Sequence, residues 1–411
     1  MSAAASNREF DVIVWGATGF TGTLVAEYFK RRYGIGSDLR WAIAGRNRQK
    51  LDELRHALGE EAESLHVLTA DSLDQDSMAE LAKKARVILT TVGPYALYGS
   101  ALVQACVEAG THYCDLAGEV QWIRKMIDQH HERAKQTGAR IVHCCGFDSV
   151  PMDIGVWFLQ DTAKQRFGEY CKSITMLVKA TKGAASGGTI ASMMNILKES
   201  SEDREVARLL VDPYSLNPEG ERTGPDGRDQ QSAIYLDDAK SWTAPFVMAI
   251  VNSKVVRRSH ALAGYPYGSD FRYHEAVMTG DGIAGCVKGT IMTGVLGTFM
   301  TAGSFSPTRH VLEKFVAKPG DGPDRKLRES GFFNLMQIGV LPDGTVLKTR
   351  ITGDQDPGYG STSKMLSECA VCLAKDDLDS EGGILTPASA MAEPLLKRLT
   401  KNAGLTFELS D

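Results

Sequence analysis

The 411-residue sequence predicts an α/β fold in which a doubly wound parallel sheet is followed by a second, mixed α+β domain. Short apolar runs alternate with helical patterns from residue 10 to residue 144, as expected when helices connect parallel strands. A glycine-rich turn joins the first apolar run to the first helical pattern. This alternation ends near Pro151, where longer alternating patterns and a hairpin signal begin. We therefore expect two domains of different architecture.

The first domain is expected to span residues 1–150 and to form a Rossmann-type sheet. Its strands should be buried, because the apolar runs are too short for helices and most are rich in Val, Ile and Leu. The expected strands are 10–15, 39–44, 65–70, 87–92, 113–115 and 140–144, and the expected helices are 21–32, 48–58, 77–84, 101–109 and 120–137. This order predicts helices on both faces of the sheet.

The second domain is expected to span residues 151–350 and to bind the substrate. The pair Asp343-Gly344 lies between two apolar runs and predicts a hairpin within residues 332–351. The other expected elements are helices at 152–163 and 188–200, strands at 173–181 and 265–278, and a surface loop at 212–232. Residues 351–411 should form C-terminal helices at 362–374 and 388–402 that pack back on the first domain.

Charge and cysteine usage exclude several classes of protein. With 46 basic and 51 acidic residues the net charge is −5, and no basic stripe indicates a nucleic-acid partner. The eight cysteines lie mostly in apolar runs, which is atypical of a disulfide-stapled secreted protein. Cys369 and Cys372 lack a second pair at metal-ligand spacing, so we expect core thiols and no metal. The first residues show no signal-peptide pattern, so a cytoplasmic location is expected.

The turn after the first strand carries the clearest functional motif. Gly16, Gly19 and Gly22 follow the strand at a spacing of three and open the predicted helix. In such a motif the first glycine permits a tight turn, the second lets the backbone approach a pyrophosphate, and the third lets helix and strand pack closely. A purely structural turn is the alternative. The expected binding loop is Gly16, Ala17, Thr18, Gly19, Phe20, Thr21 and Gly22.

The end of the second strand predicts which dinucleotide binds. NAD-specific sites usually carry a carboxylate there, whereas this chain has Gly45, Arg46 and Asn47, with Lys50 one turn later. A guanidinium can bind a 2′-phosphate but cannot accept a hydrogen bond from a 2′-hydroxyl. We therefore expect NADP, with solvated helix-start charges as the alternative. Further cofactor contacts are expected at the next two strand ends, from Asp71, Gly93, Pro94 and Tyr95.

Three polar residues near predicted strand ends are candidates for catalysis. Tyr95 is the first choice as hydrogen-bond donor because it follows the turn expected at the nicotinamide, and packing against the cofactor is an equal alternative. Asp148 could transfer a proton, but it is more typical of a helix cap. His112 is more typical of a structural histidine. Asp115 and Glu119 could form an acid–base pair, although their spacing by itself indicates little.

Several segments together resemble the saccharopine dehydrogenase-like oxidoreductase family. They are GATGFTG (16–22), AGRN (44–47), TVGPYALYG (91–99), THYCDLAGE (111–119), GFDSVP (146–151), SGGTIAS (186–192), WTAPFVM (242–248), FRYHE (271–275) and GGILTP (382–387). The chain looks most similar to the branch of trans-acting enoyl reductases, over nearly its whole length. The resemblance implies a Rossmann domain, NADP and reductase chemistry, with polyketide or lipid-like substrates in that branch.

Three interpretations of the function stay open. The first is an NADP-dependent reductase of an apolar enoyl or ketone substrate, and the second is a saccharopine-type dehydrogenase that acts on a C–N bond. The third is a non-catalytic NADP-binding or lipid-surface-associated protein. An apolar small-molecule substrate is favoured because the second domain offers aromatic and Met side chains but few charges to bind several carboxylates. The expected substrate contacts are Trp242, Phe246, Met248, Tyr267 and Tyr273.

The sequence also bears on partners. The apolar segment 285–305 is rich in Gly and Thr and is interrupted by Lys288, so we expect a buried helix, with a membrane-surface element as the alternative. Arg257 and Arg258 are expected on a strand, with at most one of them facing the cavity. A homodimer and a peripheral contact with a membrane or lipid surface stay open as interactions.

Overall fold

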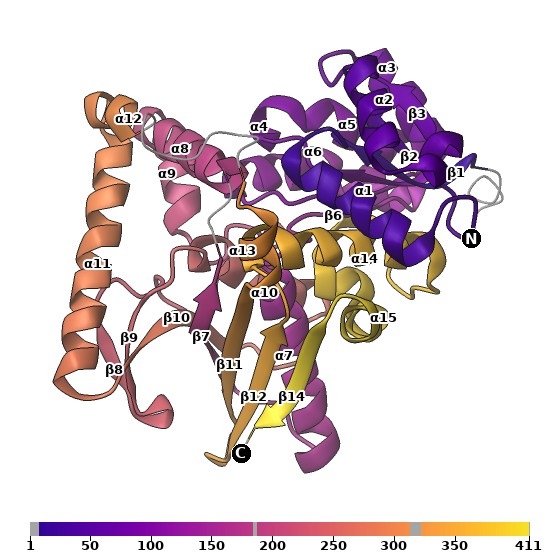
Figure 1. The fold of residues 1–411 in the computed structure, drawn as a ribbon. Helices are drawn as coiled ribbons and strands as arrows, with labels where there is room; N and C mark the ends of the chain where they lie inside the picture. Colours follow the sequence, from indigo (N-terminus) through magenta and orange to yellow (C-terminus); the bar gives the residue numbers. More distant parts are fainter. Residues whose placement is uncertain (1–7, 184–186, 313–321, 411) are drawn as a thin grey trace.

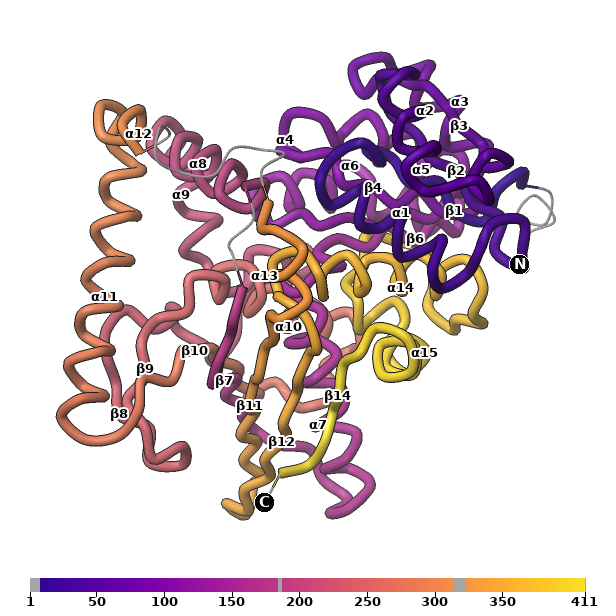
Figure 2. The backbone as a smooth tube through the Cα atoms, viewed as in Figure 1, coloured from indigo at the N-terminus to yellow at the C-terminus, as the bar shows by residue number. Residues whose placement is uncertain are grey.

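The computed structural model of the protein describes residues 8–183, 187–312 and 322–410. These residues form two seven-stranded sheets with helices packed around them. The first sheet and its helices lie on one side of the molecule and the second sheet on the other (Figure 1). The C-terminal part of the chain runs close to both (Figure 2).

The first sheet is entirely parallel and has the order β13-β6-β5-β4-β1-β2-β3. Its strands are β1 (Phe10–Trp15), β2 (Trp41–Gly45), β3 (His66–Thr69), β4 (Ala85–Thr90), β5 (His112–Cys114), β6 (Arg140–Val142) and β13 (Gly383–Leu385). The strand order reverses between β1 and β4, which is where ligands bind in such sheets. The expected Rossmann-type sheet is thereby confirmed.

Helices cover both faces of this sheet, and the central strand β1 has apolar side chains that are buried on both faces. Val12 and Val14 pack with side chains of α1, α2 and α14, whereas Ile13 and Trp15 pack with side chains of α3, α5 and α6. The helices are α1 (Phe20–Tyr33), α2 (Arg48–Ala57), α3 (Gln75–Lys84), α4 (Tyr95–Tyr98), α5 (Ser100–Ala109), α6 (Val120–Thr137) and α14 (Thr362–Lys375). The alternation of side chains along a strand therefore accounts for the doubly wound arrangement.

The second sheet is mixed and has the order β14-β12-β11-β7-β10-β9-β8. Only β10 and β7 pair in parallel among its described strands, and the expected hairpin is formed by β11 and β12. The strands are β7 (Ser173–Lys182), β8 (Ile234–Leu236), β9 (Ser241–Pro245), β10 (Arg272–Gly280), β11 (Phe332–Val340), β12 (Val346–Gly353) and β14 (Leu405–Ser410). The helices that follow or precede them are α7 (Val150–Phe167), α8 (Gly187–Glu202), α9 (Arg204–Val211), α10 (Ala249–Leu262), α11 (Gly282–Ser304), α12 (Ser306–Leu312) and α13 (Arg325–Glu329).

The C-terminal segment belongs to both sheets. Helix α14 packs against α1, β1, β4 and β5 of the first domain, and α15 (Pro387–Asn402) contacts α14, α7, α10 and β14. Two short strands in this segment were not expected: β13 extends the first sheet and β14 forms an edge of the second. The apolar runs of β13 and β14 are too short to be recognised as strands in the sequence, because only their pairing with neighbouring strands identifies them.

Two expectations about the second domain are wrong. Arg257 and Arg258 lie on helix α10 and not on a strand, and both side chains are buried. The segment expected to be a buried helix forms α11, which is helical but largely exposed. In Figure 1, α11 lies along one edge of the molecule.

Candidate functional site

The dinucleotide loop has the geometry that its glycines require. Gly16 has φ of +84°, a conformation that side chains rarely permit. A Cβ at Gly22 would lie 2.2 Å from the carbonyl oxygen of Gly16, so only glycine lets α1 approach β1 this closely. Gly19 occupies the N-cap of α1 and no side chain caps that end. The first N–H groups of α1 are thus available to a phosphate, together with the positive end of the helix dipole.

The end of β2 fits a 2′-phosphate. Arg46 and Lys50 are exposed side chains lining the pocket, and neither forms an ion pair with another described residue. Asn47 caps α2 by accepting a hydrogen bond from the backbone N–H of Lys50 at 3.0 Å. Two positive charges without a carboxylate at this end of the pocket suit NADP and leave the 2′-hydroxyl of NAD without an acceptor.

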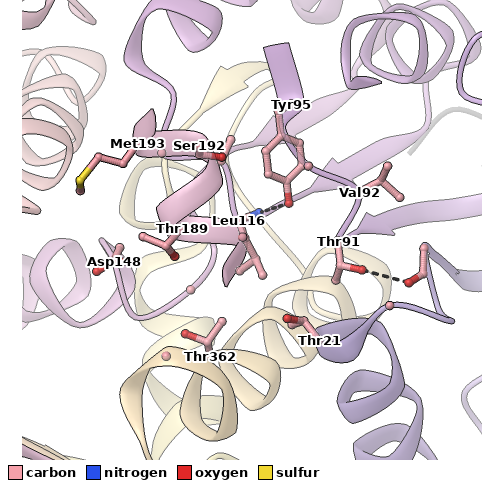
Figure 3. A pocket seen from close by; sticks show the side chains of 18 of the residues that line it. Thr21, Thr91, Val92, Tyr95, Leu116, Asp148, Thr189, Ser192, Met193 and Thr362 are labelled. Carbon is pink, nitrogen blue, oxygen red and sulfur yellow. Dashed lines mark hydrogen bonds between the residues drawn. The ribbon is translucent and has the colours of Figure 1, made fainter. Parts of the chain in front are cut away.

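One pocket of about 630 Å³ begins at this loop and continues toward the second domain. Figure 3 shows Thr21 and Thr91 on one side and Asp148, Thr189 and Met193 on another. The sequence-predicted residues that line it are Gly16, Thr18, Gly19, Phe20, Thr21, Gly45, Arg46, Asn47, Lys50, Gly93, Tyr95, Asp148 and Met248. The predicted residues that do not line it are Ala17, Gly22, Asp71, Pro94, His112, Trp242, Phe246, Tyr267 and Tyr273.

Two of the residues outside the pocket still shape the cofactor site. Ala17 and Gly22 are parts of the tight β1–α1 junction. At the third strand end, Asp71 turns its carboxylate back to accept from the N–H of Leu73 at 3.0 Å, and the neighbouring Ser72 lines the pocket instead.

The hydroxyl of Tyr95 is held by the backbone. It donates to the carbonyl oxygen of Thr90 at 3.3 Å and accepts from the N–H of Leu116 at 3.1 Å. Figure 3 shows the bond to Leu116. The ring stacks on Trp122 with centroids 5.6 Å apart. Burial raises the pKa of Tyr95 well above its usual value. Because its pKa is raised and its hydroxyl is engaged in two hydrogen bonds with the backbone, Tyr95 forms part of the pocket wall and is a poor proton donor.

Asp148 presents a carboxyl group to the pocket. Its side chain forms no hydrogen bond with the residues that the structure describes, and burial raises its pKa to about 6. The helix-cap interpretation is wrong, because Ser149 is the N-cap of α7 and no side chain caps that helix. Ser149 has φ of +115°, and this unusual turn separates Asp148 from the helix. Asp148 is also the only carboxylate among the described residues that line the pocket.

His112 lies away from this pocket. It is the first residue of β5, whereas the pocket forms at the carboxyl ends of the strands. Its Nδ1 accepts a hydrogen bond from the N–H of Arg140 at 3.1 Å, and burial lowers its pKa to about 3. A neutral, backbone-bonded histidine at the opposite end of the strand has a structural role.

Asp115 and Glu119 serve as scaffolding and do not form an acid–base pair. Asp115 accepts from the hydroxyl of Tyr113 at 2.9 Å and contacts the His143 ring at 2.7 Å. Glu119 accepts from the N–H groups of Tyr95 and the next residue at 2.7 and 2.9 Å, and from the hydroxyl of Ser192 at 2.9 Å. Glu119 thereby joins the start of α4 to α8 across the edge of the pocket.

The aromatic residues expected at the substrate site point elsewhere. Tyr273 is fully buried and donates to Glu275 at 2.8 Å, and Tyr267 stacks on His260 with centroids 4.9 Å apart. Trp242 packs against Tyr235 in the second sheet. These aromatic side chains alternate with polar ones along strands and loops. They fill the interior of the second domain and do not line the nicotinamide end of the pocket.

Apart from the predicted Met248, much of the apolar wall of the pocket comes from helices that the sequence did not assign to the site. Its side chains are Met193, Ile196 and Leu197 of α8, Leu210 of α9 and Met300 of α11. Spacings of three and four along α8 place its side chains on one helix face. That periodicity is readable in the sequence, but a core-facing helix has the same pattern.

The two adjacent arginines of α10 do not line the pocket. Arg257 Nε donates to Asp226 at 2.7 Å, and Arg258 donates to the carbonyl oxygens of Leu216 and Ile384 at 2.5 and 2.6 Å. Both are structural cross-links. Among the described residues, no group of three His, Cys, Asp or Glu side chains is arranged to hold a metal ion.

The chain is similar in sequence to a known family and to curated proteins. Residues 12–142 match the family model of the saccharopine dehydrogenase NADP binding domain. A Mycobacterium tuberculosis protein named "Putative trans-acting enoyl reductase" is 41% identical over 418 residues, which cover 98% of each chain. A Mycobacterium bovis protein named trans-acting enoyl reductase is 37% identical over 410 residues, which cover 96% of each chain.

A solved structure shares the fold. Apo saccharopine dehydrogenase (L-Glu forming) from Saccharomyces cerevisiae is similar with a TM-score of 0.54 at 12% identity, over 98% of this chain and 100% of that chain. The full-length relatives, the matched domain, the glycine loop and the two basic residues after β2 all indicate the same family and cofactor. The chain therefore belongs to the saccharopine dehydrogenase-like family and is an NADP-binding oxidoreductase.

Proposed function

We propose that the protein reduces the conjugated C=C bond of an enoyl thioester with a long apolar chain, using NADPH. The relatives named trans-acting enoyl reductases support this reaction. The observation that carries the proposal is a pocket that starts at the dinucleotide loop, passes one carboxyl group at Asp148 and ends at an apolar wall.

Different residues along that pocket bind the cofactor and the substrate. The N-terminus of α1 and the glycine loop hold the pyrophosphate, and Arg46 with Lys50 holds the 2′-phosphate. When bound, NADPH supplies a hydride to the β-carbon of the enoyl group. The wall of α8, α9 and α11 side chains binds the hydrocarbon chain and excludes water.

Asp148 supplies the proton that completes the reduction. The α-carbon gains electron density as the β-carbon gains its hydrogen, and the Asp148 carboxylic acid donates a proton there. The C=C bond becomes a C–C bond with two new C–H bonds, and Asp148 is left as a carboxylate that solvent reprotonates. A carboxyl group with a pKa of about 6 is half protonated at about pH 6 and about one-tenth protonated at pH 7, a far larger fraction than for an ordinary aspartate, so the acid form that this step requires is available.

A saccharopine-type reaction on a C–N bond is the second candidate. The fold shared with saccharopine dehydrogenase favours it. Such a substrate carries several carboxylates, and the only described cations lining the pocket are Arg46 and Lys50, at the cofactor end. The apolar wall offers those carboxylates no partners, so enoyl reduction is the better-supported reaction.

The test is turnover of NADPH by the purified full chain with a series of 2-enoyl thioesters, compared with saccharopine and NADP. We expect consumption of NADPH with the enoyl series, formation of the saturated thioester, and a kcat/KM that increases with chain length. Turnover of saccharopine in preference to every enoyl thioester would contradict the proposal.

A further inference from the structure

Helix α11 exposes an apolar face that nothing in the described structure covers. Ile283, Val287, Ile291 and Val295 are 85%, 52%, 60% and 65% exposed. They recur every four residues and so share one side of the helix. The 23 residues of α11 include one charged side chain, Lys288, and no carboxylate. By length and composition this helix could cross a membrane, although little of it is buried in the protein.

Five side-chain hydroxyl groups of α11 form their hydrogen bonds within the helix. The hydroxyls of Thr290, Thr293, Thr298 and Thr301 each donate to the carbonyl oxygen four residues earlier, at 2.8 to 2.9 Å. Ser304 does the same at 2.9 Å. These threonine and serine hydroxyls therefore need no hydrogen bond from water, which is the condition for contact with hydrocarbon.

Helix α11 packs against the protein at two of its glycines. A Cβ at Gly289 would lie 3.1 Å from the Thr279 hydroxyl of β10, and one at Gly303 would lie 2.4 Å from Leu197 of α8. These contacts lie in the third turn and in the last turn of α11, on the side away from the exposed stripe, and none of the residues between them is buried. A helix of this kind suits the surface of a lipid layer and not a transmembrane path.

The same helix reaches the substrate pocket. Met300, one turn before the C-terminus of α11, lines that pocket beside Leu197 and Leu210. Phe305, between α11 and α12, and Val311 of α12 are exposed apolar side chains. In Figure 1 the ends of α8, α9, α11 and α12 lie together at this corner of the molecule. The apolar end of the pocket therefore lies at the same end of α11 as exposed apolar side chains.

We infer that α11 docks the protein on a phospholipid surface and that the hydrocarbon chain of the substrate enters between α8, α9 and α11. The docking rests on the exposed face of α11 alone, whereas the entry route rests on the proposed function. A chain that leaves a lipid layer at this corner meets Met300 and Leu197 before it reaches the nicotinamide end. The route keeps the hydrocarbon out of water throughout.

The test is flotation of the purified full chain with vesicles of neutral phosphatidylcholine. We expect binding that high salt does not abolish, because the face is apolar. The double substitution Ile291→Glu with Val295→Glu should lower the vesicle partition coefficient about 100-fold or more, since two apolar contacts are replaced by charges. Phe167→Glu, at the exposed end of α7, is the matched control and should bind vesicles as the unchanged protein does.

Measurements of NADPH turnover distinguish lipid docking by α11 from the proposed enoyl reduction. The double variant should oxidise NADPH normally with a short, soluble enoyl thioester but lose turnover of a long-chain substrate carried in vesicles. Failure of the unchanged protein to bind vesicles would overturn the docking, whatever the activity. A dimer in solution that the double variant dissociates would also overturn it, because the face would then belong to a second copy. Vesicle binding without any enoyl turnover would leave the docking intact and contradict the proposed function.

Discussion

The proposed chemistry depends on a single carboxyl group, which lies in an unusual turn. Asp148 lies in the turn before α7, where the positive φ of Ser149 separates it from the helix end. Ser149 is anchored by a hydrogen bond to Asn252 at 2.9 Å, and Asn252 donates to the buried Glu275 at 3.1 Å. This chain of contacts holds the turn, so that Asp148 faces the pocket without a hydrogen-bond partner among the described residues.

Replacing Asp148 by Asn should remove the proton donor and leave the pocket shape unchanged. We expect kcat for enoyl reduction to fall by about 100-fold to 10,000-fold, the range typical of a lost general acid. The affinity for NADPH, measured by fluorescence titration, should stay the same. A kcat close to that of the unchanged protein would show that solvent and not Asp148 provides the proton.

The pH profile gives a second test of the same group. The acid form donates the proton, so kcat/KM should be level below the pKa of about 6 and should decrease as pH rises above it. The Asp148→Asn variant should lose this decrease, because its amide does not titrate. Steady-state rates at several pH values check both statements, and an identical decrease in the variant would assign the titration to another group.

We propose that Arg46 selects NADP over NAD. Arg46→Ala should weaken NADPH binding about 10-fold to 100-fold, which corresponds to one charge-assisted contact with a phosphate. Binding of NADH should change little, since NADH has no 2′-phosphate. Arg48→Ala is a suitable control, because Arg48 already pairs with Asp52 at 2.8 Å and does not line the pocket. Equal weakening of both cofactors would remove Arg46 from this role.

At the scale of elements, the contact between β1 and α1 is the least tolerant part of the site. Gly22→Ala should lower the free energy of unfolding by about 1–3 kcal/mol, because the new methyl group would displace backbone atoms of Gly16. NADPH affinity should fall with it, since the loop itself must move. Gly294→Ala in α11 is the matched control: the space around it is open, and the change should be neutral or slightly stabilising. Thermal unfolding and NADPH titration measure both variants.

At the scale of the molecule, the C-terminal segment couples the two sheets. Helix α15 contacts α14 on the first domain, α7 and α10 on the second, and the edge strand β14. Leu395 of α15 is fully buried in the large core cluster that these elements share. We therefore expect both domains to unfold together.

Leu395→Ala tests that coupling. The cavity should lower the free energy of unfolding by about 2–5 kcal/mol, and tryptophan fluorescence and NADPH-dependent protection should be lost in one transition. The exposed Thr400→Ala in the same helix should change the unfolding transition little. Two separate transitions in the Leu395→Ala protein would show that the domains are stable independently.

Local patterns were sufficient for the first domain and its cofactor. The strands β1 and β4, the glycine turn and the basic residues after β2 are specified within a few neighbouring residues, by side-chain periodicity, backbone freedom and charge. NADP and the Rossmann-type sheet therefore follow from the sequence. The tertiary structure decided the rest, because it depends on contacts between residues far apart in the chain. Those contacts hold the Asp148 carboxyl group at the pocket and place β13 and β14 at sheet edges. They also bring side chains of α8, α9 and α11 together in one apolar wall, and they leave the outer face of α11 uncovered by described residues.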